Sequence, residues 1–387
     1  MTSSTGSSSS SAALALLALL GAACGGPRAA GGDAARPPAR VLKVALLPAD
    51  NLAAGPVPLR ELDGELLRVA QGAGLQVVSG EPVEDFLEKH RLRFTGGIDA
   101  TSAAAAREEL GVDAILLAEV EAYASQPAPR LAVTARLVSA TPEARLLWID
   151  GVARAGDDSP GLLGLGLVRD PRALEARELA RLRGSLARAL ETGVAAPPCP
   201  DEGRFEPRVA FRSPQFDPGG GYSVAVLPFF NETSRRRAGE LLALELTRQL
   251  AAYRRLQVVE PGVTRDRLRR YRVIMEGGVS LDTARAMIEV LQTDVVIAGY
   301  VRELVDGDAP SMDFTAMALD RAGRLVWQAT SHATGNDRVW LFEQGRVSTA
   351  SALACRLSRS AAVSLFGATE QAPASSAPTR ATEERRP

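Results

Sequence analysis

Lysine and histidine are almost missing from this chain of 387 residues, which has two lysines (Lys43, Lys89) and two histidines (His90, His332). The net charge of -1 gives no general reason to expect a nucleic-acid partner. No spacing of cysteine and histidine is typical of a metal site, so we expect no metal. We interpret each histidine as a lone surface or packed side chain. The excess of arginine over lysine is typical of GC-rich coding.

Nucleotide-binding glycine loops are missing as well. The pairs at 96–97 and 277–278 and the run at 219–221 lack the Lys-Ser/Thr of a phosphate loop. They also lack the strand–helix placement of a dinucleotide fingerprint, so we interpret them as turns. With no catalytic constellation and no cofactor motif in view, we expect a protein that is not an enzyme.

The N-terminus carries a short apolar run, SAALALLALLGAAC, over residues 11–24. It is too short to span a bilayer and fits the apolar region of a secretory signal. The cysteine after Gly-Ala-Ala resembles a bacterial lipoprotein processing site, which predicts a signal peptide over 1–23 and a lipid on Cys24. Gly21 stands where such sites usually have Leu, and the first eleven residues carry no Lys or Arg. A cleaved secretory signal and a low-complexity cytosolic leader therefore stay open as alternatives.

The residue after Cys24 is Gly rather than Asp. By analogy with enterobacterial lipoproteins, we expect a periplasm-facing chain anchored in the outer membrane rather than the inner one. If Cys24 carries the lipid, Cys199 and Cys355 remain, and in an oxidising periplasm they could pair. We favour the simpler interpretation, in which Cys355 is a small buried residue on a helix and Cys199 lies in a linker. Whether they pair stays open.

The chain repeats itself at an offset of about 180 residues, as the sequence shows on direct comparison. LKVALLPADN (42–51) shares its Val-Ala-x-Leu-Pro-x-x-Asn frame with SVAVLPFFNET (223–233). LQVV recurs at 75–78 and 256–259, and GVDAILLAEV (111–120) matches QTDVVIAGYV (292–301). We infer a tandem duplication.

The duplication sets the expected organisation of the chain. A flexible tether over 24–40 precedes a first unit over 41–193. A linker rich in Pro and Gly, 194–221, leads to a second unit over 222–367 and a disordered tail over 368–387.

Within each unit the hydrophobic periods alternate between strands and helices. The first strand is almost continuously apolar, as a strand buried on both faces should be. Residues 62, 66 and 70 match 242, 246 and 250, and this spacing stacks them on one helical face. Asp99 and Ser280 are expected N-caps, and Trp148 and Trp327 are expected in the core.

The expected order is β-α-β-α-α-β-β-β-α in both units. Helical crossovers imply that the first three strands are parallel, and the last two strands form an antiparallel hairpin. The fold class is therefore α/β, an α+β sandwich built twice, with a mixed sheet of about five strands per unit.

The second unit resembles the periplasmic α/β domain shared by the lipoproteins CsgG and LpoB and by the TolB amino-terminal domain. The residues that carry the resemblance are VAVLPFFNET, the following helix, LQVVE, and the helix before TDVVIAGYV. The first unit matches more weakly, because Ala49 and Asp50 replace the phenylalanine pair. The resemblance implies a non-catalytic interaction or assembly platform in the cell envelope, bound to an envelope protein. The alternatives are a subunit of a CsgG-like secretion assembly, and a small-ligand binder or enzyme.

The second unit also holds a local excess of arginine. Residues 235–272 contain eleven arginines against four acids, a difference of 11 − 4 = +7. One interpretation is a docking surface for an acidic partner, a glycan phosphate or an anionic lipid head group. The alternative, which we favour, is a solvated face in an arginine-rich protein. The candidate partner-binding residues are Phe229, Phe230, Arg235, Arg236, Arg237, Arg265, Arg267, Arg269 and Arg270.

Three polar residues follow the first strands of the two units. Ligands of open α/β sheets tend to bind at this end of a strand. We favour the structural alternative, in which Asn51, Asn231 and Thr233 shape the strand-end turn or cap the next helix. Of the two phenylalanines beside Asn231, we expect one in the core and one exposed.

Overall fold

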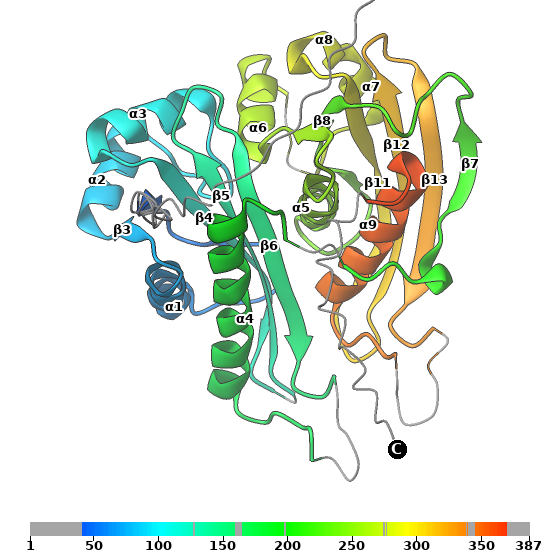
Figure 1. Cartoon of the computed structure of the whole chain (residues 1–387). Helices are drawn as coiled ribbons and strands as arrows, with labels where there is room; N and C mark the ends of the chain where they lie inside the picture. Colours follow the sequence, from blue (N-terminus) through cyan, green and yellow to red (C-terminus); the bar gives the residue numbers. More distant parts are fainter. Residues whose placement is uncertain are drawn as a thin grey trace, which may run out of the picture. The chain divides into compact units, whose positions relative to one another are not determined.

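The computed structural model describes residues 41–369, except 127, 159–164, 197–198, 274, 276, 338 and 340–344 (Figure 1). The predicted signal peptide, Cys24, the tether and nearly all of the predicted tail lie outside the described residues. The described residues from Val41 onward form one compact unit that contains two mixed sheets. Helices cover both faces of each sheet, which is the α/β architecture that the sequence predicts.

The first module has the sheet order β3-β1-β4-β5-β6. Strands β3 and β4 pair in parallel with β1, whereas β5 and β6 continue the sheet antiparallel. Helices α1 and α4 cover one face, and α2 and α3 lie against the other. The elements are β1 (Lys43–Leu46), β2 (Asp50–Asn51), α1 (Leu59–Gly72), β3 (Gln76–Val78), α2 (Glu81–Lys89), α3 (Ala100–Leu110), β4 (Ala114–Ala124), β5 (Arg130–Ser139), β6 (Leu146–Ala155) and α4 (Pro171–Thr192).

The second module has the sheet order β10-β8-β11-β12-β13-β7, with the same strand directions. Helices α5 and α9 cover one face, and α6, α7 and α8 cover part of the other. The elements are β7 (Arg208–Arg212), β8 (Tyr222–Val226), β9 (Phe230–Asn231), α5 (Ala238–Ala251), β10 (Leu256–Val258), α6 (Pro261–Arg270), α7 (Leu281–Ala286), α8 (Ile288–Leu291), β11 (Val295–Val305), β12 (Ser311–Asp320), β13 (Leu325–Thr334) and α9 (Ala350–Phe366).

The two modules repeat each other at the level of strand register. Val44 of β1 lies beside Ala114 of β4, and Val224 of β8 lies beside Val295 of β11. Short β2 and β9 pair in the same way with the next stretch of β4 and β11. A residue of the second module therefore has a structural counterpart 179 to 181 positions earlier in the chain.

Local signals place the helices and the two core tryptophans where the sequence predicts. Asp99 accepts hydrogen bonds from the backbone N–H groups of Thr101 and Ser102 at 2.9 and 3.0 Å, and Ser280 caps α7. Both predicted N-caps are confirmed. Trp148 and Trp327 are buried, and each indole donates to a serine of the terminal helix of its module.

The predicted linker contributes a strand and a short 3-10 turn, η2 (Gly203–Phe205). Strand β7 pairs antiparallel with β13 and forms an edge of the second sheet, with all five residues exposed. Its period-two alternation is only five residues long and lies between Pro207 and Pro214. Prolines beside a strand are tolerated at sheet edges, because no neighbour on the open side needs their missing N–H groups.

The linker is also fixed to the second module by a disulfide bond between Cys199 and Cys355. The preference for unpaired cysteines is wrong on this point, although Cys355 is buried on α9 as expected. The backbone N–H of Cys199 donates to Oε1 of Gln249 on α5 at 3.0 Å. The disulfide holds the linker across α5 and α9. The Cα atoms of Cys199 and Cys355 are 6.0 Å apart.

Candidate functional site

The second module packs against one face of the first module's sheet. Helices α2 and α3 cover one part of that face. The remaining part is covered by α5 and the start of α6, where Leu244 packs on Leu52 and Ile149 and Val263 joins the core beneath α2 and α3. A surface that would otherwise be open is thus buried between the modules.

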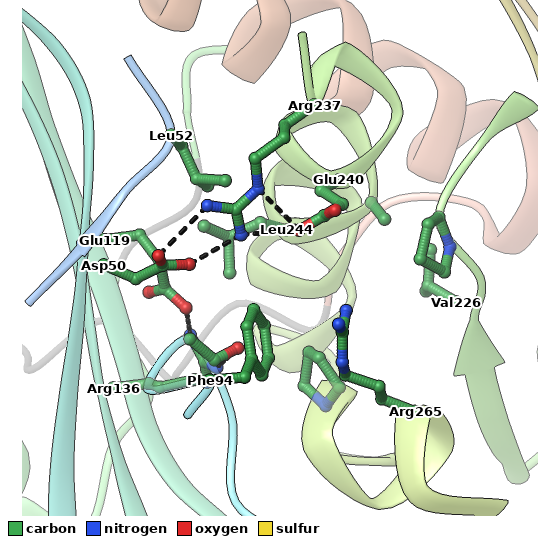
Figure 2. A pocket seen from close by; sticks show the side chains of 14 residues that line it. Asp50, Leu52, Phe94, Glu119, Arg136, Val226, Arg237, Glu240, Leu244 and Arg265 are labelled. Carbon is green, nitrogen blue, oxygen red and sulfur yellow. Dashed lines mark hydrogen bonds and ion pairs between the residues drawn. The ribbon is translucent and has the colours of Figure 1, made fainter. Parts of the chain in front are cut away.

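Arg136 lies at the centre of this contact, fully buried on β5 (Figure 2). Its guanidinium donates to Glu119 on β4, to Glu260 at the start of α6 at 3.1 Å, and to the carbonyl oxygen of Gly96 at 3.0 Å. Burial raises the pKa of Glu119 to about 7 and also raises the pKa of Glu260, while the Arg136 charge opposes both rises. One cation therefore joins carboxyl groups from both modules.

A second arginine joins the modules at the start of α5. Arg237 donates to both carboxylate oxygens of Asp50 at 3.0 and 2.6 Å, to Glu240 at 2.6 Å, and to the carbonyl oxygen of Asn51 at 2.8 Å. A two-pronged bond of this kind fixes direction as well as distance. Arg237 adopts a left-handed backbone conformation with φ of 60°, which is uncommon outside glycine.

The third cluster lies farther along α5. Arg248 donates to Asp150 on β6 at 2.9 Å and lies 3.5 Å from Glu245. Burial raises the pKa of Glu245 to about 8, and the nearby carboxyl of Glu121 raises it further, against the effect of Arg248. Glu121 is itself buried and accepts a hydrogen bond from Thr134 at 2.6 Å.

A cavity of about 50 Å³ lies between the modules beside the Arg136 and Arg237 clusters (Figure 2). It has room for a few water molecules and is far smaller than an ordinary small-molecule pocket. Phe94 of the first module and Arg265 of α6 meet at its wall, with the guanidinium 3.9 Å from the ring centroid. The charged groups around the cavity bond one another across the module boundary, so the arrangement joins the two modules.

The two candidate phenylalanines have different environments, as expected. Phe229 is fully buried and packs edge-on against Phe314, with ring centroids 6.2 Å apart. Phe230 is 38% exposed and packs edge-on against Tyr300 at 6.0 Å. Phe230 is therefore the one that a partner can reach.

The candidate arginines also divide into two groups. Arg235 is buried, bonds Asp306 at 2.7 Å and the carbonyl oxygen of Glu121 at 3.0 Å, and with Arg237 and Arg265 belongs to the module boundary. Arg267 is partly buried and donates to the carbonyl oxygen of Leu291. The exposed members of the set are Arg236, Arg269 and Arg270.

The structure separates Phe230 from the end of α6. Leu291, which accepts from Arg267, precedes β11 at the amino end of the parallel strands, whereas Phe230 follows the carboxyl end of β8. A helix that links parallel strands runs back along the sheet, so one end of the helix lies near the carboxyl ends of the strands and the other near their amino ends. The predicted arginine surface is thus not one continuous face with Phe230.

Asn51 and Asn231 make the same turn in the two modules. Each side-chain oxygen accepts from the backbone N–H two residues on, at 2.8 Å from Ala53 and 3.0 Å from Thr233. Each side-chain N–H group donates to the carbonyl oxygen four residues on, at Gly55 and Arg235. These bonds close a turn after each strand.

Sequence reasoning did not single out Glu119, Glu121 or Arg136. A signal was present, because all three interrupt otherwise apolar strands, in AILLAEVEAYA and RLAVTARLVS. Charged residues are rarely fully buried unless they are paired. Their positions inside core strands therefore indicate an interface within the protein.

The described part of the chain holds no group of three or more His, Cys, Asp or Glu side chains placed to bind a metal ion. No helix among the described residues is long and apolar enough to cross a membrane.

No family model and no curated protein matches this chain. Three similar solved structures are a PelC dodecamer from Paraburkholderia phytofirmans, the lipoprotein GNA1162 from Neisseria meningitidis and the LpoB C-terminal domain from Escherichia coli. Their identities are 19%, 18% and 14%, and their TM-scores 0.28, 0.26 and 0.24. The matches cover 42%, 38% and 29% of this chain and 99%, 99% and 82% of theirs. At these values the likenesses carry no argument about family or function.

Proposed function

We propose that this chain is a lipid-anchored, non-catalytic binding protein of the bacterial cell envelope. The observation that carries the proposal is the exposed end of α6. There Tyr271 is 60% exposed and is flanked by exposed Arg269, Arg270 and Arg272. Tyrosine and arginine are the side chains that most often anchor protein interfaces, and an arginine cluster fits an acidic partner.

Two further observations concern the setting and the charged groups between the modules. The Cys199–Cys355 disulfide fits an oxidising compartment such as the periplasm, and the apolar leader ending at Cys24 supplies the lipid attachment. The carboxyl groups of Glu119 and Asp50 beside the cavity of about 50 Å³ bond Arg136 and Arg237 at the module boundary, so these charged groups hold the two modules together.

Affinity capture from cross-linked envelope extracts tests the proposal with the full chain. Arg269→Glu/Arg270→Glu reverses two charges at the end of α6 and should remove the specific partner. The matched control is Arg321→Glu/Arg324→Glu at the β12–β13 turn, where both side chains are 71% exposed. The control should keep the partner.

The same extracts test the anchor, because wild type should sediment with membranes and Cys24→Ser should not. Partner lists that are the same for all variants would overturn the proposed binding surface. A Cys24→Ser chain that stays with the membranes would overturn the proposed anchor.

A further inference from the structure

The sheet face that the second module covers on the first module has an open counterpart on the second module itself. Phe230 and Tyr300 stand at the register positions of Asp50 and Glu119, and Arg302 is the bulge residue of β11 as Glu121 is of β4. In the first module Glu119 and Glu121 are buried beneath α5 and α6. In the second module the side chains of Arg302 and His332 are 40% and 58% exposed, and Phe230 is exposed too.

The covering surface has an open counterpart as well. The groove between α5 and α6 that receives the first module corresponds to a groove between α1 and α2. That groove has a volume of about 350 Å³, and its lining includes Arg60, Asp63, Gly64 and Ser79. These are the counterparts of Glu240, Ala243, Leu244 and Glu260, which lie in or beside the module contact. The internal contact joins a sheet face of the first module to a helical groove of the second. The chain also exposes the corresponding sheet face of the second module and the corresponding groove of the first.

The two unused surfaces differ from the internal contact in a coordinated way. Asp50, which is bonded to Arg237 in the internal contact, corresponds to Phe230 on the open face. Arg237 corresponds in the aligned sequence to Val57, which packs against the core beneath α1 and α4. The positions of this ion pair therefore hold apolar residues in the unused surfaces, whereas Arg60 and Asp63 keep charged side chains in the lining of the groove.

The central ionic cluster changes together in the same manner. Arg136, Glu119 and Glu260 correspond to Met317, Tyr300 and Ser79, which are all uncharged. Ser79 follows LQVV in the first module as Glu260 follows LQVV in the second. Met317 is already buried within the second module. Covering Tyr300 and Ser79 between two copies would strand no charge, and the Tyr300 hydroxyl and Ser79 are able to share a hydrogen bond.

A third position gains an attractive pair. In the internal contact the pKa of Glu245 is raised by burial and, in addition, by the charge of the nearby Glu121. Their counterparts are Arg302 and Glu65, which carry opposite charges. Glu65 bonds Arg68 at 2.7 Å within α1 and remains 37% exposed.

We propose that a second copy of this chain docks its α1–α2 groove on the open β9, β11–β13 face of the first, repeating the internal contact between molecules. The two surfaces are different patches, so the association is head-to-tail, and each added copy presents a fresh open face. Contacts of this type give closed rings or filaments rather than symmetric dimers. The contact lies at the opposite end of the sheet from the arginine surface of α6, and it goes beyond the proposed partner binding.

Two single substitutions test the proposal with the full chain purified in detergent. Phe230→Asp introduces the residue that the first module has at the corresponding position, Asp50, and its charge should prevent docking on the open face. Gly64→Arg blocks the groove, and its new side chain enters open space because nothing lies within 4 Å of the added Cβ. Wild type should assemble, and each variant should stay monomeric by analytical ultracentrifugation, with association weakened at least roughly 30-fold.

The decisive measurement is the mixture of the two variants. Phe230→Asp keeps its groove and Gly64→Arg keeps its open face, so an equal mixture should form a dimer of one copy of each and nothing larger. A monomeric wild type, or a mixture that contains no such dimer, would overturn the proposal. Unfolding midpoints of the two variants that match wild type establish that both are folded.

Charge exchange provides a second, independent readout. Arg302→Glu should weaken assembly by about tenfold, and Arg302→Glu/Glu65→Arg should restore it, since the pair is then attractive again. Restoration by the double variant supports the predicted pairing. A double variant as weak as the single one contradicts it.

Discussion

Arg136 shows at the scale of one residue why the two modules stay together. It is fully buried, and its partners Glu119 and Glu260 come from different modules. Removing one member of a buried ion cluster leaves the others without compensation, which typically costs about 3–5 kcal/mol. We therefore expect Arg136→Met to lower the free energy of unfolding by about that amount in urea titrations followed by circular dichroism.

The second module offers a matched control for this substitution. Arg136→Met/Glu119→Tyr/Glu260→Ser installs the residues of the counterpart positions 317, 300 and 79, and Ser at 260 can still cap α6. Because the triple variant buries no unpaired charge, it should recover most of the lost stability. A triple variant less stable than Arg136→Met would contradict this account of the cluster.

Individual residues were predictable from the sequence where local geometry decides their role. The N-caps Asp99 and Ser280 depend only on their neighbours in the chain. Arg136 and Glu119 are buried instead by contact with the second module. The partner of Arg136 in that module, Glu260, lies more than a hundred residues farther along the chain. Single-sequence patterns carry no information on which surface will meet such a charge.

At the scale of elements, hydrophobic period predicted the order of the longer strands and helices in both modules. It did not predict the two-residue strands β2 and β9 or the division of one helix into α7 and α8. It missed β7, because a five-residue strand beside prolines gives a weak signal. It also gave the wrong preference for Cys199, since the position of the linker across α5 is a tertiary contact through Gln249. Elements placed by their own periodicity were thus predictable, and those placed by distant neighbours were not.

The disulfide allows a prediction about the linker and α9. It closes a loop with a sequence separation of 156, and a loop of this length restricts the unfolded chain strongly. Cys199→Ser/Cys355→Ser should lower the free energy of unfolding by about 2–5 kcal/mol, and reductant should have the same effect on wild type. If reductant destabilises the double variant as much as wild type, the effect does not come from this bond.

For the whole molecule, the repeated sequence pattern predicted two similar modules but not how they meet. Identical patches on related modules would suggest a symmetric contact, yet the structure joins the sheet face of one to the helices of the other. This asymmetry leaves an open groove on the first module and an open sheet face on the second. It follows from the residues that differ between modules, such as Asp50 and Phe230, and not from those that repeat.

The shared charge clusters predict that the two modules unfold together. The clusters of Arg136, Arg237 and Arg248 each contain an ion pair between the two modules. If the modules separate, the charged residues on both sides lose these partners. Chains that keep one tryptophan report each module separately, with Trp148 in the first and Trp327 in the second. In each case the other two tryptophans are replaced by Phe, Trp340 included. The urea midpoints of the two single-tryptophan chains should coincide when no other residue is changed.

Weakening the contact should then separate the two transitions. In the Arg136→Met background the modules lose their central link, so the Trp148 and Trp327 midpoints should differ. The triple variant with Tyr at 119 and Ser at 260 should bring them back together, because its contact is again free of unpaired charge. Separate midpoints in the wild-type background would mean that each module is stable without the other, and the clusters would then serve only to orient the two modules.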